Sequence, residues 1–410
     1  MTGVGISIWK DFNLGDLVSI TTGKLDSNAA KPNGQYPFFT CSRETFFTDT
    51  YSFDCECVLL AGNNAAGIYP IKFFHGKFDA YQRTYVIRSK EDRLLNNRFL
   101  FYLLQPKLEL LKSISTGAAT KFLTLTILKG LKLPRPPVDL QRKIASILSS
   151  YDDLIENNLR RIKILEEMAQ AIYHEWFIRF RFPGHEKVKM VNSPLGKIPE
   201  GWEVSTLVRG CDSIEDGDWI ESKDQGGNDY RLLQVSNIGI GTFVETDNFR
   251  YVTQKTFDRL RCREVLSGDI LISRMPKPTG RAWLVTRMPW KMITAVDVAI
   301  AKVNQNKVNP FFFLYHLNTP ENLGLVDKHQ IGTTRPRISR KNLGVLPFVV
   351  PPLSLQHRFG QFASRNYELT TVLIQKNISL HRSRDLLLPK LISGEIDVEK
   401  MDIDVGGLGG

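Results

Sequence analysis

The feature that most constrains this chain is an internal repeat. Residues 136–141 (Pro-Pro-Val-Asp-Leu-Gln) recur 215 positions later as residues 351–356 (Pro-Pro-Leu-Ser-Leu-Gln), with four of the six identical. The Asp-to-Ser difference exchanges two residues that both favour a helix N-cap. At the same offset Gly117 matches Gly332 and Leu131 matches Leu346. A repeat of this kind predicts two copies of one structural plan within the chain.

Each half of the repeat follows the same order. About 130 to 145 mixed residues come first, then a proline-marked boundary, then a long helix. Apolar β-branched runs predict strands at residues 57–60, 84–87, 269–272 and 296–300, and helical composition marks residues 96–111 and 309–317. Both globular halves are therefore predicted to be mixed α/β rather than all-β.

The first long helix is predicted from heptad spacing. Its seam alternates steps of four and three residues, and only Asn158 on it is polar. That asparagine either fixes the register of a coiled coil or is a solvated break. From Leu140 to Trp176 the helix would run about 55 Å at roughly 1.5 Å per residue. The predicted seam is Ile144, Leu148, Tyr151, Ile155, Asn158, Ile162, Leu165, Ala169, Ile172 and Trp176.

The second long helix, from residue 355 to about 388, has a poorer seam. Asn366, Thr370, Asn377 and Arg384 interrupt its stripe, so we expect it to need a partner. The simplest partner is the first helix, in an antiparallel coiled coil that makes the molecule pseudo-twofold symmetric. The apolar positions expected to pack are Phe359, Ala363, Leu373, Leu380, Leu387 and Leu391.

Composition narrows the class of protein. The 54 Lys and Arg against 43 Asp and Glu give a net charge of +11, which favours a polyanionic partner without separating DNA-binding from ribosomal or membrane-surface proteins. No apolar run reaches the roughly 18 to 20 residues of a membrane span. No secretory signal pattern precedes Lys10, so we expect a cytoplasmic protein. Cys55 and Cys57 are too close for a zinc pair, which predicts reduced thiols and no metal.

Several phrases along the chain resemble the specificity subunits of type I restriction-modification complexes. Residues 134–144 and 351–356 resemble the family's starts of its two spacer helices, and residues 115–125 resemble the loop before such a helix. Residues 195–204 (Leu-Gly-Lys-Ile-Pro-Glu-Gly-Trp-Glu-Val) resemble the opening of the second recognition domain. Residues 387–396 resemble the closing phrase. The resemblance spans nearly the whole chain, although the glycine-rich residues 406–410 have no counterpart in it.

The resemblance implies a sequence-specific subunit that binds double-stranded DNA at a bipartite, asymmetric site. It also implies partners, namely two methyltransferase subunits and, in the larger assembly, motor-nuclease subunits. The expected domains are target recognition domain 1 (1–138), the first spacer helix (139–183), a linker (184–201), target recognition domain 2 (202–350), the second spacer helix (351–392) and a C-terminal tail (393–410).

Catalytic motifs are missing from the sequence. It has no glycine-rich cofactor loop followed by a helix, no Asn/Asp/Ser-Pro-Pro-aromatic tetrad and no Walker-type loop. We therefore predict no catalytic residue and no cofactor. The alternatives are a stand-alone or degenerate DNA methyltransferase or nuclease, and a scaffold whose charge serves only protein contacts.

Candidate DNA contacts come from cations and amides in predicted loops. In the second half, Thr333, Thr334, Arg335, Arg337, Arg340 and Lys341 form one basic segment, and Arg274, Lys277 and Arg281 form another. In the first half, the candidates are Asn63, Asn64, Gln82, Arg83 and Lys121, with Lys121 in the loop equivalent to that of Arg335. Because these loops differ between the halves, each half is expected to read different bases.

Overall fold

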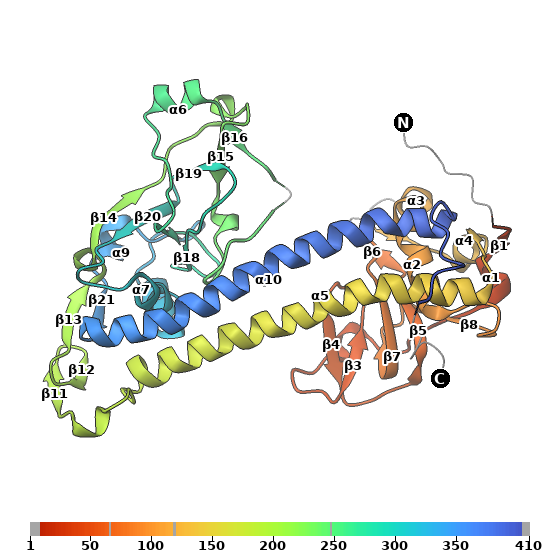
Figure 1. Cartoon of the computed structure of the whole chain (residues 1–410), viewed down its shortest axis with the longest axis horizontal. Helices are drawn as coiled ribbons and strands as arrows, with labels where there is room; N and C mark the ends of the chain where they lie inside the picture. The colour runs from red at the N-terminus through yellow and green to blue at the C-terminus, as the bar shows by residue number, and fades with distance from the viewer. Residues whose placement is uncertain (1–8, 65–66, 118–119, 247, 404–410) are drawn as a thin grey trace. The chain divides into compact units, whose positions relative to one another are not determined.

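The computed structural model describes residues 9–64, 67–117, 120–246 and 248–403. The chain forms two compact units: unit 1 comprises residues 1–159 and 374–410, and unit 2 comprises residues 160–373. Two long helices, α5 (Val138–Tyr173) and α10 (Leu353–Ser393), contribute residues to both units (Figure 1). The glycine-rich residues 406–410 lie outside the described residues.

Unit 1 is built on a six-stranded sheet in the order β2-β8-β5-β7-β3-β4. In β5, Val58 and Leu60 pack into one apolar cluster while Cys57 and Leu59 pack into another, because alternate side chains of a strand point to opposite faces. Both faces of the sheet are therefore covered, which explains the continuous apolar run. The elements are β1 (Asp11–Asn13), α1 (Leu14–Leu17), β2 (Val18–Thr22), η1 (Ser27–Ala29), β3 (Tyr36–Phe39), β4 (Thr45–Thr48), β5 (Phe53–Ala61), β6 (Asn63–Asn64), β7 (Ile71–Ala80), β8 (Thr84–Ser89), α2 (Asn97–Leu104), η2 (Gln105–Lys107), α3 (Leu108–Ile114), β9 (Lys121–Phe122), α4 (Leu125–Lys129) and β10 (Lys132–Pro134).

The helical segment predicted at residues 96–111 is two helices rather than one. A short 3-10 turn, η2, separates α2 from α3 and contains Pro106. Proline lacks an amide hydrogen and its ring clashes with the preceding turn, so the α-helical hydrogen bonding is interrupted there. The start of α2 is fixed by Asn96, whose side chain accepts a hydrogen bond from the Phe99 amide at 2.9 Å.

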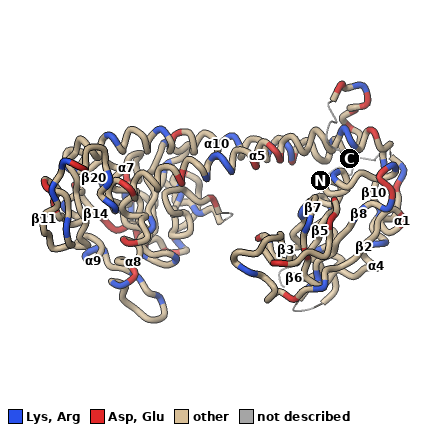
Figure 2. The backbone as a smooth tube through the Cα atoms, turned by 90° about the horizontal axis from the view of Figure 1, so that it is seen from below, with Lys and Arg blue, Asp and Glu red and all other residues tan. Residues whose placement is uncertain are grey.

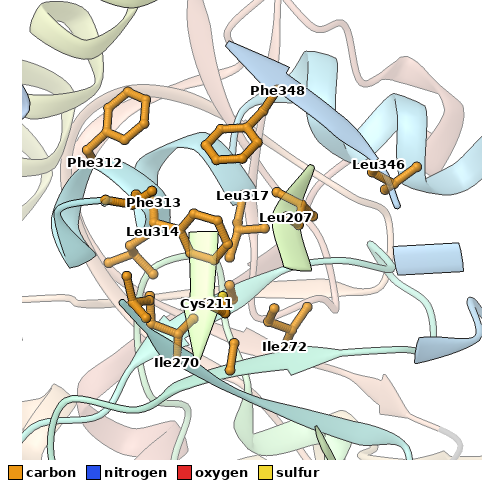
Figure 3. Close-up of a cluster of buried hydrophobic side chains, with 14 of the residues drawn as sticks. Leu207, Cys211, Ile270, Ile272, Phe312, Phe313, Leu314, Leu317, Leu346 and Phe348 are labelled. Carbon is orange, nitrogen blue, oxygen red and sulfur yellow. The ribbon is translucent and has the colours of Figure 1, made fainter. Parts of the chain in front are cut away.

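Unit 2 contains a four-stranded sheet in the order β14-β20-β17-β18 and a separate three-stranded sheet in the order β16-β15-β19. Helix α7 buries Phe313 and Leu317 against Leu207, Ile272 and Phe348 in the core (Figure 3). The elements are η3 (His174–Ile178), η4 (His185–Lys187), β11 (Met190–Ser193), β12 (Gly196–Pro199), β13 (Glu203–Thr206), η5 (Leu207–Gly210), β14 (Cys211–Asp216), η6 (Ser222–Asp224), β15 (Tyr230–Leu233), η7 (Val235–Asn237), β16 (Tyr251–Val252), α6 (Gln254–Leu260), β17 (Ile270–Ser273), β18 (Ala282–Leu284), β19 (Lys291–Thr294), β20 (Val298–Val303), α7 (Pro310–Leu317), α8 (Pro320–Lys328), α9 (Arg340–Gly344) and β21 (Pro347–Val350).

The repeat seen in the sequence is a repeat of topology. The strand order β2-β8-β5-β7 of unit 1 recurs as β14-β20-β17-β18 in unit 2, with antiparallel pairing throughout. The two-stranded pair β1-β10 recurs as β13-β21. The two units therefore have related folds. Unit 1 extends this sheet by β3 and β4, whereas unit 2 has a separate sheet of β15, β16 and β19 and the β11–β12 pair.

The repeated glutamine has the same role in each unit. Gln141 accepts a hydrogen bond from the Asn96 amide at 2.9 Å and donates to the Pro136 carbonyl at 2.8 Å. Gln356 accepts from the Asn309 amide at 2.9 Å and donates to the Pro351 carbonyl at 2.7 Å. Both side chains are fully buried. Each glutamine thus ties the start of a long helix to the cap of α2 or α7.

We predict that Gln141→Leu destabilises the protein by about 3 kcal/mol, because the Asn96 amide and the carbonyls of Pro136 and Leu94 lose their hydrogen bonds to the glutamine. Thermal unfolding measures the effect as a lower Tm. The control is Gln170→Leu, which changes an exposed position of α5 and is expected to cost less than about 0.5 kcal/mol. Equal Tm values for Gln141→Leu and the control would show that the buried network contributes nothing.

Polar residues that interrupt the second helix find partners on the first. In unit 1, Asn377 accepts from the buried Asn158 amide at 2.8 Å, and Arg384 pairs with Asp152. In unit 2, Asn366 donates to the Leu165 carbonyl at 3.3 Å. In unit 2, the Tyr173 ring also lies 5.4 Å from the Phe359 ring, so that in each unit the partners on α10 run in the opposite sequence direction to those on α5. Asn158 is therefore not a solvated break.

The predicted apolar seam residues of both helices lie at buried or half-buried positions. The buried ones are Ile144, Leu148, Ile155, Ala169, Phe359, Ala363, Leu373 and Leu391. The half-buried ones are Tyr151, Ile162, Leu165, Ile172, Trp176, Leu380 and Leu387.

Candidate nucleic-acid interface

In unit 1, three segments that are distant in sequence converge at the end of β5. Strand β6 pairs antiparallel with β9, so that Asn63 faces Phe122 and Asn64 faces Lys121. The Arg83 guanidinium lies 5.5 Å from the centre of the Phe122 ring. We call Asn63, Asn64, Arg83, Lys121 and Phe122 the unit 1 cluster. It contains four of the five residues that were predicted from the first half of the sequence to contact DNA.

The fifth nominated residue, Gln82, is held beside the cluster. Its side-chain amide donates to Asp26 at 2.6 Å, and its backbone amide donates to the Leu25 carbonyl at 2.9 Å. The Gln82 side chain is exposed, and one of the two donors of its amide is already engaged.

Close backbone approach positions the unit 1 cluster. The Gly62 amide donates to the Arg83 carbonyl at 2.8 Å, and a Cβ on Gly62 would lie only 2.6 Å from that oxygen. Gly117 has a φ of 106°, and the turn that follows it is closed by two hydrogen bonds between Thr116 and Phe122. Glycine is required at both positions, because a side chain would clash or be strained.

The same turn occurs in unit 2 at the offset of the sequence repeat. Ile331 and Arg337 exchange two backbone hydrogen bonds as Thr116 and Phe122 do, and Gly332 has a φ of 99°. The Ile338 amide donates to the Arg274 carbonyl at 3.1 Å, as the Leu123 amide donates to Gly62. The two nominated basic segments of unit 2 therefore lie against each other.

An ionic cluster occupies this place in unit 2. Arg274 lies 3.3 Å from Asp216 and 3.8 Å from Asp297, while Arg337 lies 3.7 Å from Asp297 and Arg340 lies 3.6 Å from Asp216. We call these five residues the unit 2 cluster. Three guanidinium groups share two carboxylates, so the unit 2 cluster carries a net positive charge. Lys and Arg positions lie next to α9 in Figure 2.

The guanidinium groups of the unit 2 cluster differ in exposure. The side chain of Arg274 is 9% exposed, against 61% for Arg337 and 50% for Arg340. Arg337 and Arg340 are accessible to a ligand. Arg274 is enclosed, and it also donates to the Val296 carbonyl at 2.7 Å.

Arg281 is buried as well. Its guanidinium donates to the carbonyls of Ile238, Met275, Pro278 and Val235, and burial lowers its pKa. The expectation that Arg274 and Arg281 touch DNA themselves does not fit their burial, since their donors are used within the protein. They hold the loop that exposes Lys277.

The other nominated residues of unit 2 lie at the surface. Thr333, Thr334 and Arg335 are exposed on the turn between Ile331 and Arg337, and Lys341 is exposed in α9. Helix α9 is capped by Ser339, whose hydroxyl accepts from the Asn342 amide at 3.1 Å. Exposed cations and hydroxyls on one turn are suited to phosphate and base contacts.

Comparisons with known proteins give consistent matches to one family. Residues 7–167 match the model of the type I restriction modification DNA specificity domain. The Type I restriction enzyme EcoDI specificity subunit of Escherichia coli is 27% identical over 95% of this chain and 89% of its own length. The MjaIX specificity subunit of Methanocaldococcus jannaschii is 28% identical over 74% of this chain and 70% of its own.

Along nearly its whole length this chain is therefore similar to type I specificity subunits. Its fold agrees, because it resembles the crystal structure of a type I restriction-modification system S subunit from M. genitalium with a TM-score of 0.63, at 19% identity over 95% of this chain and 97% of that one.

The sequence did not predict several residues at the candidate interface. Asp216 and Asp297 neutralise part of the basic cluster of unit 2, and Cys41 contacts Asn63 in unit 1. None of the three stands in a basic or amide-rich segment, so no local pattern marks them. Only the strand pairing brings them to the interface.

Within residues 9–64, 67–117, 120–246 and 248–403, no group of three or more His, Cys, Asp or Glu side chains is arranged to hold a metal ion. Among the same residues, no helix is long and apolar enough to cross a membrane.

Proposed function

We propose that this specificity subunit reads a bipartite, asymmetric site on double-stranded DNA, with one half-site for each unit. The observation that carries the proposal is the repeated turn, which lies beside amides and one arginine in unit 1 but beside exposed arginines in unit 2. One fold with two different sets of side chains is suited to reading two different sequences.

The proposed DNA contacts are the exposed members of this interface. Phosphates and base edges require side chains whose donors are free to leave the protein surface. Arg274, Arg281 and Gln82 are positioning residues in this proposal. The contacts are Asn63, Asn64, Arg83, Lys121, Lys277, Thr333, Thr334, Arg335, Arg337, Arg340 and Lys341.

We further propose that α5 and α10 form an antiparallel coiled coil that sets the separation of the half-sites, in a pseudo-twofold arrangement. The Asn158–Asn377 pair in unit 1 and the Asn366–Leu165 hydrogen bond in unit 2 support this arrangement. The recognition domains in this proposal are residues 1–138 and 202–350. The spacer helices are residues 139–183 and 351–392, with a linker at 184–201 and a tail at 393–410.

The chain is proposed to contribute recognition and no catalysis. Its partners in this proposal are two adenine methyltransferase subunits and, in the full complex, motor-nuclease subunits in the cytoplasm. The relatives named as specificity subunits of restriction enzymes support this assignment.

Methylation mapping tests the proposed function. Methylated adenines are mapped genome-wide in the source strain and in a strain that lacks this chain. We expect one bipartite motif to lose methylation in the deletion strain and to regain it on complementation. An unchanged methylation map would contradict the proposal.

The alternative of a stand-alone methyltransferase or nuclease has its own readout. Purified chain would then retain a radiolabelled methyl donor or nick DNA with magnesium alone. The proposed adaptor does neither without its partner subunits.

A further inference from the structure

We propose that Arg83 reads a guanine in the major groove of the unit 1 half-site, and that Phe122 is the positioning residue that holds its guanidinium for this contact. The inference rests on the proposed function and deepens it, because it names one base that unit 1 selects. Guanine is the base that presents two hydrogen-bond acceptors, N7 and O6, in the major groove.

The backbones of Arg83 and Phe122 are held in fixed positions on neighbouring segments. Gly62 joins the two segments, because its amide donates to the Arg83 carbonyl at 2.8 Å and its carbonyl accepts from the Leu123 amide at 2.9 Å. Phe122 also exchanges two backbone hydrogen bonds with Thr116. The Arg83 and Phe122 side chains therefore start from a defined geometry.

The Arg83 guanidinium is placed by an aromatic ring and not by an acid. The side chain is exposed, and its guanidinium carbon lies 5.5 Å from the centre of the half-buried Phe122 ring. A cation at this distance from the face of an aromatic ring is attracted to it. Among the described residues no carboxylate pairs with Arg83, and Asp26 in the neighbouring loop accepts from Gln82 at 2.6 Å. The ring contact limits the rotamers of a long side chain, so less entropy is lost when the guanidinium binds a ligand.

Unit 2 has an acid where unit 1 has Arg83. The carbonyl of Asp297 accepts from the Arg274 amide at 2.9 Å, in the hydrogen bond that corresponds to the one received by Arg83. Arg337 stands at the place of Phe122 on the repeated turn, and it lies 3.7 Å from Asp297. The guanidinium of unit 2 is therefore shared with a carboxylate. At this place, an arginine that contacts a ring is specific to unit 1.

The hydrogen-bond chemistry of a guanidinium selects the base. It has five N–H donors in a rigid fork and no acceptor. Guanine offers N7 and O6, so the fork can bind it with two hydrogen bonds, whereas adenine offers N7 beside the N6 donor and thymine offers only O4. Cytosine presents a donor. Arg83 is therefore expected to prefer guanine over each of the other three bases.

A base contact suits Arg83 better than a phosphate contact. Phosphate oxygens bind any cation that reaches them, whereas a base edge requires a pair of donors held in one direction. The ring of Phe122 meets that requirement, and the neighbouring Asn63 carries an amide of the kind that reads bases. Lys121, which pairs with Asn64 across β6 and β9, is assigned the phosphate contact of the unit 1 cluster.

Base-pair substitution tests the inference in the complex of the subunit with its methyltransferase partners. Dissociation constants are measured at several salt concentrations on duplexes that carry each of the four base pairs at each position of both half-sites. The unsubstituted complex should prefer guanine at one position of one half-site by about ten-fold or more. Arg83→Ala should remove that preference and leave the other positions and the salt slope nearly unchanged. Lys121→Ala should instead weaken binding to all duplexes alike and lower the slope by about 0.9.

The role of Phe122 is tested through Arg83. Phe122→Leu removes the ring and should reduce the guanine preference several-fold, whereas Phe122→Tyr should retain it. In the Arg83→Ala background, Phe122→Leu should cause no further change at that position, because a positioning residue acts only through the side chain that it holds. An additional change in the double variant would contradict the role assigned to Phe122.

Arg93→Ala is the matched control. Arg93 is an exposed arginine of the same unit that pairs with Glu91 at 2.6 Å, and it lies beyond the far end of β8, a strand of six residues and roughly 20 Å. This variant should bind as the unsubstituted complex does. Full guanine preference in Arg83→Ala, or an equal loss for all four base pairs, would overturn the inference and leave the proposed function intact. An unsubstituted complex that prefers no sequence would overturn the proposed function instead.

Discussion

Replacing Arg335 and Arg337 together by alanine is expected to weaken DNA binding by about thirty-fold or more and to flatten its salt dependence. Each lost phosphate contact lowers the slope of log affinity against log salt by about 0.9, so two contacts lower it by roughly 1.8. The loss in affinity corresponds to about 2 kcal/mol. Binding is measured by titration of the complex with labelled duplex at several salt concentrations.

The control for this experiment removes two cations from the same unit. Arg179 and Arg181 both pair with Glu175 and have side chains that are 54% and 63% exposed. Replacing both by alanine changes the net charge equally but touches neither nominated segment. The slope should then stay close to that of the unsubstituted complex. Equal slopes for both double variants would reject the turn as a phosphate-binding site.

The sequence predicted the architecture where the same signal occurred twice. The Pro-Pro boundary and its glutamine recur at 215 residues, and the structure gives Gln141 and Gln356 the same buried hydrogen bonds. The same hydrogen bonds can form only where the surrounding backbone has the same conformation. The repeated sequence therefore implied a repeated fold. Single local signals were weaker, as the break of the helix at Pro106 illustrates.

Only part of the site could be predicted, because the composition of a loop does not determine which of its side chains are exposed. Arg337 and Arg274 stand in similar basic, proline-containing loops, yet one is exposed and the other is enclosed by Asp216 and Asp297. The residues of a loop do not by themselves determine whether a side chain points to solvent or into the protein. The two aspartates reach the loop only through the pairing of β14, β17 and β20.

The polar residues on α10 also depend on partners that are distant in the sequence. Taken alone, Asn377 and Arg384 weaken a helical seam. Their partners, Asn158 and Asp152, lie more than 200 positions earlier in the chain. The periodicity of one helix carries no information about residues on another. The polar residues in the seam of α10 are there because they bind side chains of α5.

Lengthening both spacer helices by four residues is expected to lengthen the gap in the methylated motif by nearly two base pairs. The insertions follow Leu159 in α5 and Leu373 in α10, so that the Asn158–Asn377 pair and the Asn366–Leu165 hydrogen bond both survive. Four helical residues add about 6 Å, and a base-pair step is roughly 3.4 Å. Methylation mapping in complemented deletion strains reports the gap directly.

Two companion variants make the spacer experiment decisive. Seven-residue insertions at the same two points keep the heptad phase and add about 10.5 Å, which predicts a gap longer by three base pairs. A four-residue insertion in the β11–β12 hairpin, between Ser193 and Gly196, changes the length of the chain without changing either helix, and the gap should stay as it is. A gap that is the same in all variants would mean that the helices do not set the half-site separation, because the two insertions lengthen the helices by different amounts. A motif that changes in its bases but not in its gap would contradict the proposal as well, because insertions in the spacer leave every proposed base contact intact.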